Sequence, residues 1–371
     1  MLLSPHGSAE AEGRVVRPLP VTFRRLLPGW KPYARIREEP ATERGSAVDS
    51  GSPDDLDQRL LHALQLDGRA PFSRIARTLG VSEHTAARRY RRLRGLGLRI
   101  VGRPSPVRLG HTRWLLRLRC APTAAGPLAA SLARRPDTSW VTLAASGTEV
   151  YCAIDARTAD ERNALLLTAL PRTPNLMSVS AHCMLQIFKG ASSTWHATRF
   201  RTAAPATASP DSDFPLRLDV TDQALFAELA RDGRATLPVL SKAAARSPSS
   251  IQRHLDRLRH HGALNLFVDF EPQLLGHHMS TQLWLTVAPA HLRSVGETVA
   301  AHPDIAFAAA VTGSANLVAN GIFRTPADLY TYIDQDLGAL PGIHSIDTVP
   351  TLHEVKRLAV PFSPVHARGR T

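Results

Sequence analysis

The chain has 371 residues, of which 43% are hydrophobic, and it carries a formal net charge of +13. That length exceeds one ordinary domain, and the apolar share suffices for several small cores, so a globally disordered chain is excluded. The sequence has no apolar run of membrane-spanning length and no signal-type N-terminus. We therefore expect a cytoplasmic protein that does not contact the membrane.

The cysteine and arginine residues indicate the redox compartment and the type of binding partner. Cys120, Cys152 and Cys183 lie far apart among apolar neighbours, which predicts free thiols in a reducing compartment. Nearly all of the positive charge is arginine. A surplus of this size is typical of contact with nucleic acid or an anionic membrane, but GC-rich coding bias produces it too. The location of the arginines must decide between these explanations.

Three segments are predicted to lie outside any core. Residues 1–50 contain six prolines and no sustained periodicity, so we expect a disordered extension. Residues 201–217 are rich in Pro, Ala, Ser and Thr and are predicted to be a linker. Residues 358–371 are expected to form a tail.

Residues 51–104 predict a compact head of three short helices. Asp57 is expected to cap the first helix, which ends at Gly68. The second helix spans 72–79 by its apolar spacing, and Gly80 then separates it from a third helix that begins after Ser82. A helix, a tight glycine turn and a basic helix form a helix-turn-helix pattern.

The third helix concentrates positive charge on one face. Its buried stripe is predicted to be Ala86, Tyr90 and Leu93, because these fall together at 100° per residue. The outward-facing side chains are expected to be His84, Thr85, Arg88, Arg91 and Arg92. Glu83 is the one carboxylate between residues 82 and 95. Solvated helices mix charges to gain pairs four residues apart, whereas unrelieved arginine is favourable opposite phosphates, so the pattern favours DNA over a merely solvated face.

Residues 105–200 predict a second kind of module. Strands and helices alternate in the order βαββαβ, which is the ferredoxin-like arrangement. The strands are expected at 111–120, 140–145, 149–154 and 176–188, and the helices at 123–135 and 158–169. Helices then cover one face of the sheet, and the other face must pack on a partner, which we expect to be another sheet.

The chain then repeats itself. Residues 57–70 (DQRLLHALQLDGRA) return as 222–235 (DQALFAELARDGRA), 165 positions later. The register persists for more than a hundred residues, which predicts a tandem duplication of a unit of about 150 residues. The second head is expected at 218–270 and the second ferredoxin-like module at 271–357. Its elements are expected at 279–287, 289–301, 305–311, 316–323, 325–339 and 343–354.

The second head repeats the geometry with less charge. Ile251, Leu255 and Leu258 form its predicted buried stripe, while Arg253 and Arg257 point outward. Residues 51–111 hold twelve basic and five acidic residues, a net +7, against eight and seven, a net +1, in residues 217–277. We therefore expect two heads that hold DNA unequally.

The first head, together with the short strands LRIVGR and LNLFVDF and the module that follows, resembles the Lrp/AsnC (feast/famine) bacterial transcription regulators. The resemblance implies an α+β chain of winged-helix-like heads and ferredoxin-like sensing modules, in which the heads enter successive major grooves of double-stranded DNA. One fused chain would replace the family's homodimer, and such chains would form a homo-oligomer through sheet stacking. The implied DNA contacts are His84, Thr85, Arg88, Arg89, Arg91, Arg92, Arg94, Ser249, Ser250, Gln252, Arg253 and Arg257.

The resemblance also implies a small-molecule effector, often an amino acid. The family's turn usually reads Gly-x-x-Asp, but the acid is absent from both copies here. The candidate effector contacts are Thr312, Gly313, Ser314 and Asn316. A plain tight turn explains Gly147 and Gly313 better than a ligand contact does.

A different class shares this two-part fold, namely the sirohaem decarboxylases. They would need histidine and arginine sites in the sensing half, for which His182, His344 and His353 are candidates by type. The arginine face of the first head has no role in that chemistry. The sequence shows no catalytic Ser/His/Asp set, nucleotide loop or metal-ligand cluster. We therefore expect a regulator without catalysis, cofactor or metal.

Overall fold

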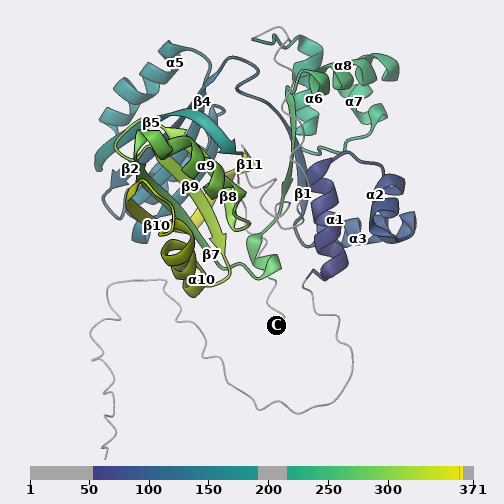
Figure 1. Cartoon of the computed structure of the whole chain (residues 1–371). Coiled ribbons are helices and arrows are strands. Elements are labelled where there is room, and N and C mark those ends of the chain that lie inside the picture. The colour runs from purple at the N-terminus through teal and green to yellow at the C-terminus, as the bar shows by residue number, and fades with distance from the viewer. Residues whose placement is uncertain (1–52, 191–214, 359, 362–371) are drawn as a thin grey trace, which may run out of the picture. The chain divides into compact units, whose positions relative to one another are not determined.

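The computed structural model describes residues 53–190, 215–358 and 360–361 (Figure 1). The predicted extension 1–50, most of the predicted linker 201–217 and most of the predicted tail 358–371 lie outside the described residues. The described residues belong to one compact unit by their contacts.

The first head consists of three helices, as predicted. They are α1 (Asp55–Leu66), α2 (Phe72–Leu79) and α3 (Glu83–Gly95). The expected cap of α1 was wrong by three residues. Asp54 is the N-cap and accepts a hydrogen bond from the Asp57 amide, while the Asp57 carboxylate accepts one from the Asp54 amide. Asp57 is therefore the second half of a capping box, because an acid at the third helical position can reach back to the cap. Gly80 ends α2 in the left-handed conformation that glycine adopts without strain (φ 70°).

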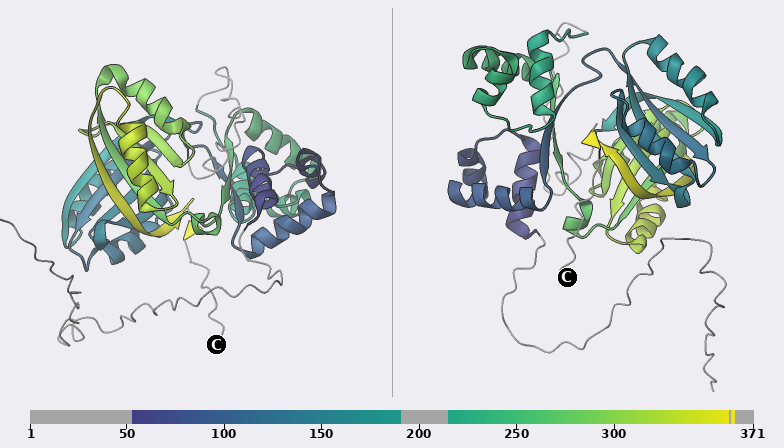
Figure 2. Two further views of the ribbon diagram at one scale, coloured as in Figure 1. Left: turned by 60° about the horizontal axis from the view of Figure 1, so that its bottom comes forward. Right: turned by 180° about the vertical axis from the view of Figure 1, so that it is seen from behind.

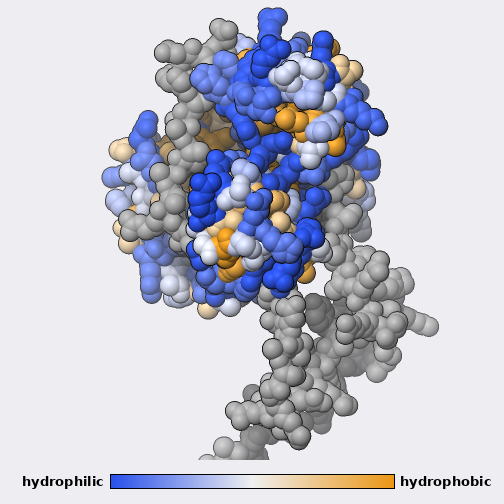
Figure 3. Space-filling view, turned by 90° about the vertical axis from the view of Figure 1, so that its right-hand side faces the viewer, coloured by the Kyte–Doolittle hydropathy of each residue, from blue (hydrophilic) through white to orange (hydrophobic). Residues whose placement is uncertain are grey.

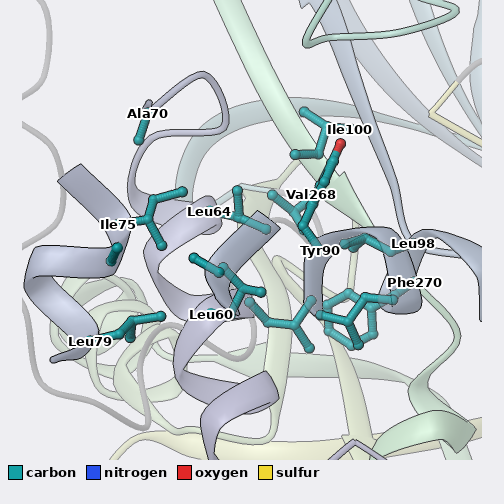
Figure 4. Packing of buried hydrophobic residues seen from close by; sticks show 14 of the residues in the cluster. Leu60, Leu64, Ala70, Ile75, Leu79, Tyr90, Leu98, Ile100, Val268 and Phe270 are labelled. Carbon is teal, nitrogen blue, oxygen red and sulfur yellow. The ribbon is translucent and has the colours of Figure 1, made fainter. Parts of the chain in front are cut away.

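The core of this head is completed by a strand from far along the chain. Leu60 and Leu64 of α1 pack with Ile100 of strand β1 (Arg99–Pro104) and with Val268 and Phe270, which belong to or follow β6 (Leu264–Asp269) (Figure 4). These five side chains are at most 7% exposed. The head thus depends on residues about 200 positions downstream for its apolar core.

A second set of three helices follows residue 215. They are α6 (Val220–Leu229), α7 (Leu237–Ala244) and α8 (Pro248–His260). Asp219 and Asp222 form a capping box at the start of α6, as Asp54 and Asp57 do at α1. Ala245 takes the left-handed position that Gly80 holds in the first head (φ 50°). This set has its own apolar cluster around Leu225, Leu255 and Leu258.

Strands β1 and β6 join the two helical sets as an antiparallel ribbon. Ile100 pairs with Val268 and Arg103 pairs with Asn265. Asn265 is the repeat counterpart of Ile100, and Val268 is the counterpart of Arg103, each 165 positions later. The two pairings are therefore equivalent, with the two copies of the repeat exchanged. The ribbon therefore has a pseudo-two-fold axis at its centre.

The first sheet module follows β1. Its elements are β2 (Thr112–Cys120), α4 (Ala125–Ala133), β3 (Thr138–Ala144), β4 (Glu149–Ala156), α5 (Ala159–Asn163, continued by a π-helical turn Ala164–Ala169) and β5 (Leu176–Lys189). The strand order is β3-β4-β2-β5, with all neighbours antiparallel. The predicted ferredoxin-like βαββαβ order is confirmed.

The second module has the same order of elements. They are β7 (Met279–Val287), α9 (Leu292–Ala301), β8 (Ile305–Val311), β9 (Leu317–Phe323), α10 (Pro326–Thr331, continued by a π-helical turn Tyr332–Leu337), β10 (Ile343–Arg357) and the short β11 (Val360–Pro361). Apolar residues on one face of each sheet pack against that module's helices.

The two sheets close on each other within the chain. Strand β5 pairs with β8 and β10 pairs with β3, so the sheets meet at both edges. Between them lies an apolar cluster that includes Leu115, Tyr151 and Trp284, while the helices lie outside (Figure 2). The expected sheet-on-sheet packing is present, but each sheet's partner is the other sheet of the same chain. The expectation that this stacking would join separate chains is therefore wrong, because the face is already covered.

Two lysines tie the modules together in a reciprocal way. Lys189, at the end of β5, donates to the carbonyl of His302 after α9 (3.2 Å). Lys356, in β10, donates to the carbonyl of Arg135 near the end of α4 (2.6 Å). Each ammonium lies just beyond the C-terminus of a helix, where the helix dipole favours a cation.

Candidate nucleic-acid interface

Helix α3 presents the expected basic face. Its N-cap is Ser82, whose hydroxyl accepts from the Thr85 amide (3.1 Å). The predicted stripe is confirmed, since Ala86, Tyr90 and Leu93 are between 1% and 7% exposed. Four of the candidate DNA contacts on this helix are exposed: His84, Arg88, Arg91 and Arg94. Thr85 is half-buried.

Two of the predicted contacts are instead held inside the head. Arg89 donates to Asp54 and Asp57 at 2.6 and 2.9 Å, and Arg92 forms an ion pair with Asp57. Asp57 has no exposed surface, so these guanidinium groups neutralise a buried carboxylate. The prediction that Arg92 faces outward was therefore wrong. A helical wheel could not find this pairing, because the carboxylates lie more than 30 residues upstream.

The pKa of Asp54 reflects the same contact. Its slight burial would raise the pKa, but the hydrogen bond from Arg89 outweighs this and holds the pKa below its ordinary value. Arg89 and Arg92 therefore fix α3 against the start of α1. This sets the direction in which the exposed arginines project.

The second head braces the buried side of α3. The guanidinium of Arg234 lies over the rings of Phe72 and Tyr90, 4.6 and 5.4 Å from their centroids. Arg94 also reaches Asp232 at 3.5 Å, although both side chains are well exposed. The charged contact from Arg94 contributes little by itself, but the stacked arginine fixes the tyrosine that carries the helix.

Helix α8 has the equivalent arrangement with weaker charge. Ile251, Leu255 and Leu258 are at most 2% exposed, which confirms the predicted stripe. Ser249, Gln252 and Arg253 are exposed, Ser250 is half-buried, and Gln252 donates to Asp256 at 2.9 Å. The side chains of Arg253 and Arg88 form no ion pair within the described parts of the chain.

Arg257 repeats the behaviour of Arg92. It forms an ion pair with the buried Asp222, to which His254 also bonds at 3.0 Å. Burial would raise the pKa of Asp222, but hydrogen bonds from Arg257 and His254 lower it below its ordinary value. Asp219, Asp222 and His254 lie close enough together to hold a metal ion. Their atoms already serve the capping box and the arginine, so we read the group as an ion-pair cluster.

The charge available on the two faces is therefore smaller than the sequence count. Arg89, Arg92 and Arg257 are used internally, which leaves Arg88, Arg91 and Arg94 exposed on α3 and Arg253 and Arg259 exposed on α8. The surface over the heads is predominantly hydrophilic, with only small apolar spots (Figure 3). Such a surface suits a hydrated polyanion better than an apolar partner.

The turn between β8 and β9 is fully engaged with its surroundings. Gly313 has φ 118°, and a Cβ there would lie 2.6 Å from Nδ1 of His182. That nitrogen also lies 2.6 Å from the Thr312 carbonyl oxygen. The Asn316 side chain pairs with both backbone groups of Val287, at 2.7 and 2.8 Å. The four candidate effector contacts all lie in this turn: Thr312, Gly313, Ser314 and Asn316.

The three candidate histidines do not form one site. His182 stacks on Trp284 (centroids 4.9 Å apart) and is half-buried. His344 and His353 are exposed on β10, nine residues apart, which corresponds to about 30 Å along a strand. The three histidines were candidates by residue type, and the fold does not bring them together.

A polar cluster inside the closed sheets was not predicted. Arg117 forms a bidentate pair with the buried Glu149 (2.9 and 3.1 Å) and also reaches Asp347 at 2.8 Å. Burial would raise the pKa of Glu149, but hydrogen bonds from Arg117 and Tyr151 lower it. Arg117, Asp347 and neighbouring residues line an open hollow of about 290 Å³. The sequence holds an arginine in β2 and a glutamate in β4. These strands are far apart along the chain, and only their pairing register brings the two side chains together.

Family comparisons agree with this arrangement. Residues 54–94 match the AsnC-type helix-turn-helix domain, and residues 282–360 match the Lrp/AsnC ligand binding domain. These two segments are therefore similar to Lrp/AsnC-family domains. The first match spans α1 to α3, and therefore includes the arginine face. The resemblance inferred from the sequence is confirmed at this level.

Curated proteins similar to this chain include transcriptional regulators from Pyrococcus. The HTH-type transcriptional regulator FL11 of Pyrococcus horikoshii is 26% identical over 136 residues, covering 36% of this chain and 89% of that protein. FL11 of Pyrococcus abyssi is 24% identical over the same shares.

A solved structure resembles the whole fold. The crystal structure of the siroheme decarboxylase NirDL superimposes with a TM-score of 0.57 at 13% identity, covering 83% of this chain and 94% of that one. Because the superposition covers 83% of this chain, it extends over more than one of the two halves. The likeness therefore includes both helical sets and both sheets. At this identity it concerns the fold alone. Across the described residues, no helix is both long and apolar enough to cross a membrane.

Proposed function

We propose that this chain is a sequence-specific DNA-binding transcription regulator, and that its two halves arose by tandem duplication and act as a fused pseudo-dimer. The observation that carries the proposal is the exposed arginine face of α3, fixed in direction by Arg89 and Arg92, within a segment that matches an AsnC-type helix-turn-helix. Arginines on such a helix can bind phosphates or pair with guanine in the major groove.

The roles within the face follow from position. Residues of the first helical turns, His84, Thr85 and Arg88, are proposed to contact bases, with Ser249, Ser250, Gln252 and Arg253 as their counterparts. Arg94 is proposed to contact phosphate, and Arg91 to contact phosphate or a guanine beside the base that Arg88 contacts. Arg89, Arg92 and Arg257 are proposed to position the helices through their ion pairs, which revises the direct contact expected from the sequence.

The pseudo-dimer is supported by exchanged contacts. The β1–β6 ribbon and the lysine contacts repeat with exchanged partners, as expected when two copies of one unit pair. The proposed units are a head at 51–104 with a module at 105–200, and a head at 218–270 with a module at 271–357. Further association of chains would use other surfaces than the stacked sheets.

The turn between β8 and β9 is the place where the family resemblance would put an effector. The solved relatives include a regulator in complex with L-Met, which concerns that protein. In this chain Thr312 and Asn316 are hydrogen-bonded to neighbouring strands and Gly313 lies against the His182 ring, so a ligand at this turn would have to displace those contacts or bind beside them. We propose a small-molecule effector only as a modulator of the DNA-binding function.

The test is binding of the full chain to fluorescent double-stranded DNA at several salt concentrations. A regulator of this kind should bind in dilute buffer, with affinity that falls steeply as salt rises because counterions are released. Arg88→Ala should weaken binding without unfolding the chain. Absence of binding to any duplex, even at low salt, would overturn the proposal.

The second candidate is a tetrapyrrole enzyme, which the likeness to NirDL favours. It would bind sirohaem through groups in the sheet modules, where Arg117 and Arg119 line the hollow. Titration of the chain with sirohaem, followed by absorbance spectroscopy, distinguishes the enzyme from the regulator. A saturable spectral change with loss of carbon dioxide would support the enzyme, whereas an unchanged spectrum beside salt-dependent DNA binding would support the regulator.

A further inference from the structure

The exposed faces of α3 and α8 differ at equivalent positions. Residues 165 positions apart are equivalent, so His84 corresponds to Ser249 and Arg88 corresponds to Arg253. At the next outward position the charge reverses, because Arg91 corresponds to Asp256, and both side chains are exposed. The two helices therefore share one arginine and differ in the side chains around it.

The two heads cannot adjust to DNA independently. Arg69 donates to the carbonyls of Gly233 and Ala235 at 2.7 and 2.8 Å, and Arg234 donates to those of Gly68 and Ala70 at 2.8 and 2.9 Å. The β1–β6 ribbon adds backbone pairing, and the core of the first head includes Val268. The heads therefore form one body.

The symmetry of these contacts sets the orientation of the recognition helices. The rotation that exchanges Arg69 with Arg234 also exchanges α3 with α8. If both helices lie against one duplex, they must approach it in opposite directions along the DNA. Each helix then meets its own half-site, and the two half-sites are inverted relative to each other.

We infer that the preferred DNA site is an inverted pair of unlike half-sites, and not a palindrome. This inference rests on the proposed function. Arg88 and Arg253 favour a guanine common to both halves. Arg91 attracts phosphate or guanine, whereas Asp256 repels phosphate and can accept only from a donor such as the cytosine amine. The half-sites thus agree at one step and diverge beside it.

The experiment begins with selection of randomised duplexes by the full chain. The selected site should contain an inverted pair of unlike halves. Its affinity is then compared by fluorescence anisotropy with the two palindromes made by doubling either half. Each palindrome forces one head onto the wrong half-site, so the chain should bind it at least about tenfold more weakly than the selected site.

Asp256→Arg tests the residue that carries the difference. It makes α8 resemble α3 at this position, so the palindrome built from the α3 half-site should recover most of the missing affinity. Asp334→Arg adds the same charge at an exposed position of the second sheet module and should leave the order of the three duplexes unchanged. Selection of a palindrome that both heads bind equally would overturn the inference while leaving the proposed function in place. Failure to enrich any duplex at low salt would overturn both.

Discussion

Arg69 and Arg234 exchange the same contact across the two heads. Each guanidinium donates to two carbonyls in the loop that carries the other arginine, at distances between 2.7 and 2.9 Å. The planar fork of a guanidinium holds two carbonyls in a fixed geometry, which a flexible ammonium does less well. This exchange makes the heads a single DNA-facing body.

Replacing either arginine by lysine should therefore loosen the pair of heads. Arg69→Lys and Arg234→Lys should each lower the free energy of unfolding by about 1–3 kcal/mol, since each removes a charged hydrogen bond. Both variants should be destabilised in chemical denaturation, and Arg234→Lys somewhat more, because Arg234 also lies over the rings of Phe72 and Tyr90. Arg231→Lys, at an exposed position of the same loop, serves as the control and should change little. A large destabilisation in only one of the pair would contradict the exchanged geometry.

The buried carboxylate of Asp57 should be a sensitive point of the first head. Asp57→Asn removes the charge that Arg89 and Arg92 neutralise, and should destabilise the chain by about 3 kcal/mol. Asp55→Asn, exposed in the same helical turn, should cost at most about 1 kcal/mol through the helix dipole. Thermal unfolding of the two variants measures the difference. Equal destabilisation would mean that the ion pairs contribute nothing.

The two heads should contribute unequally to DNA binding. Arg88→Ala with Arg92→Ala should abolish binding, while Arg253→Ala with Arg257→Ala should weaken it less, because the second head has a net charge near zero. Arg92 and Arg257 hold buried carboxylates, so each double variant must first be shown to fold by circular dichroism. Equal reductions in affinity in folded variants would refute unequal binding by the heads.

Lys189 should make stability depend on alkaline pH. Burial lowers the pKa of this lysine to about 8 in the folded chain, below its ordinary value of 10.5. Between these values the unfolded chain binds more protons, so stability should rise as pH increases from about 8 to about 10.5. Lys189→Met should reduce that rise in denaturation curves recorded across this range. An unchanged slope would show that the ammonium is not desolvated.

The sequence predicted the local structure well where one periodicity decided it. The stripes of α3 and α8 and the bounds of α2, β7 and β8 follow from apolar spacing within a single element. The roles of Arg89 and Arg92 could not be predicted, since their partners lie on another helix. Strand alternation likewise identifies an apolar face but not its neighbour, so it could not show that β5 crosses to β8.

The repeat was the most informative long-range signal. It predicted which residues would occupy equivalent places, such as Arg88 and Arg253, which are both exposed on their helices. It did not indicate the asymmetric cluster at the centre of the sheets, where Arg117 lies over Trp284 at 5.5 Å. Residues that differ between the two copies produce no repeat signal in the sequence. The contacts among such residues become visible only once the register of the strands is known.

The central claim is that the exposed arginines of α3 bind the DNA backbone and bases. The most direct measurement is the salt dependence of duplex binding by the full chain and by Arg88→Ala/Arg91→Ala. The variant should bind more weakly, and the slope of log K against log salt should become shallower by about one for each phosphate that the variant no longer neutralises. An unchanged affinity and slope in a folded variant would contradict the claim.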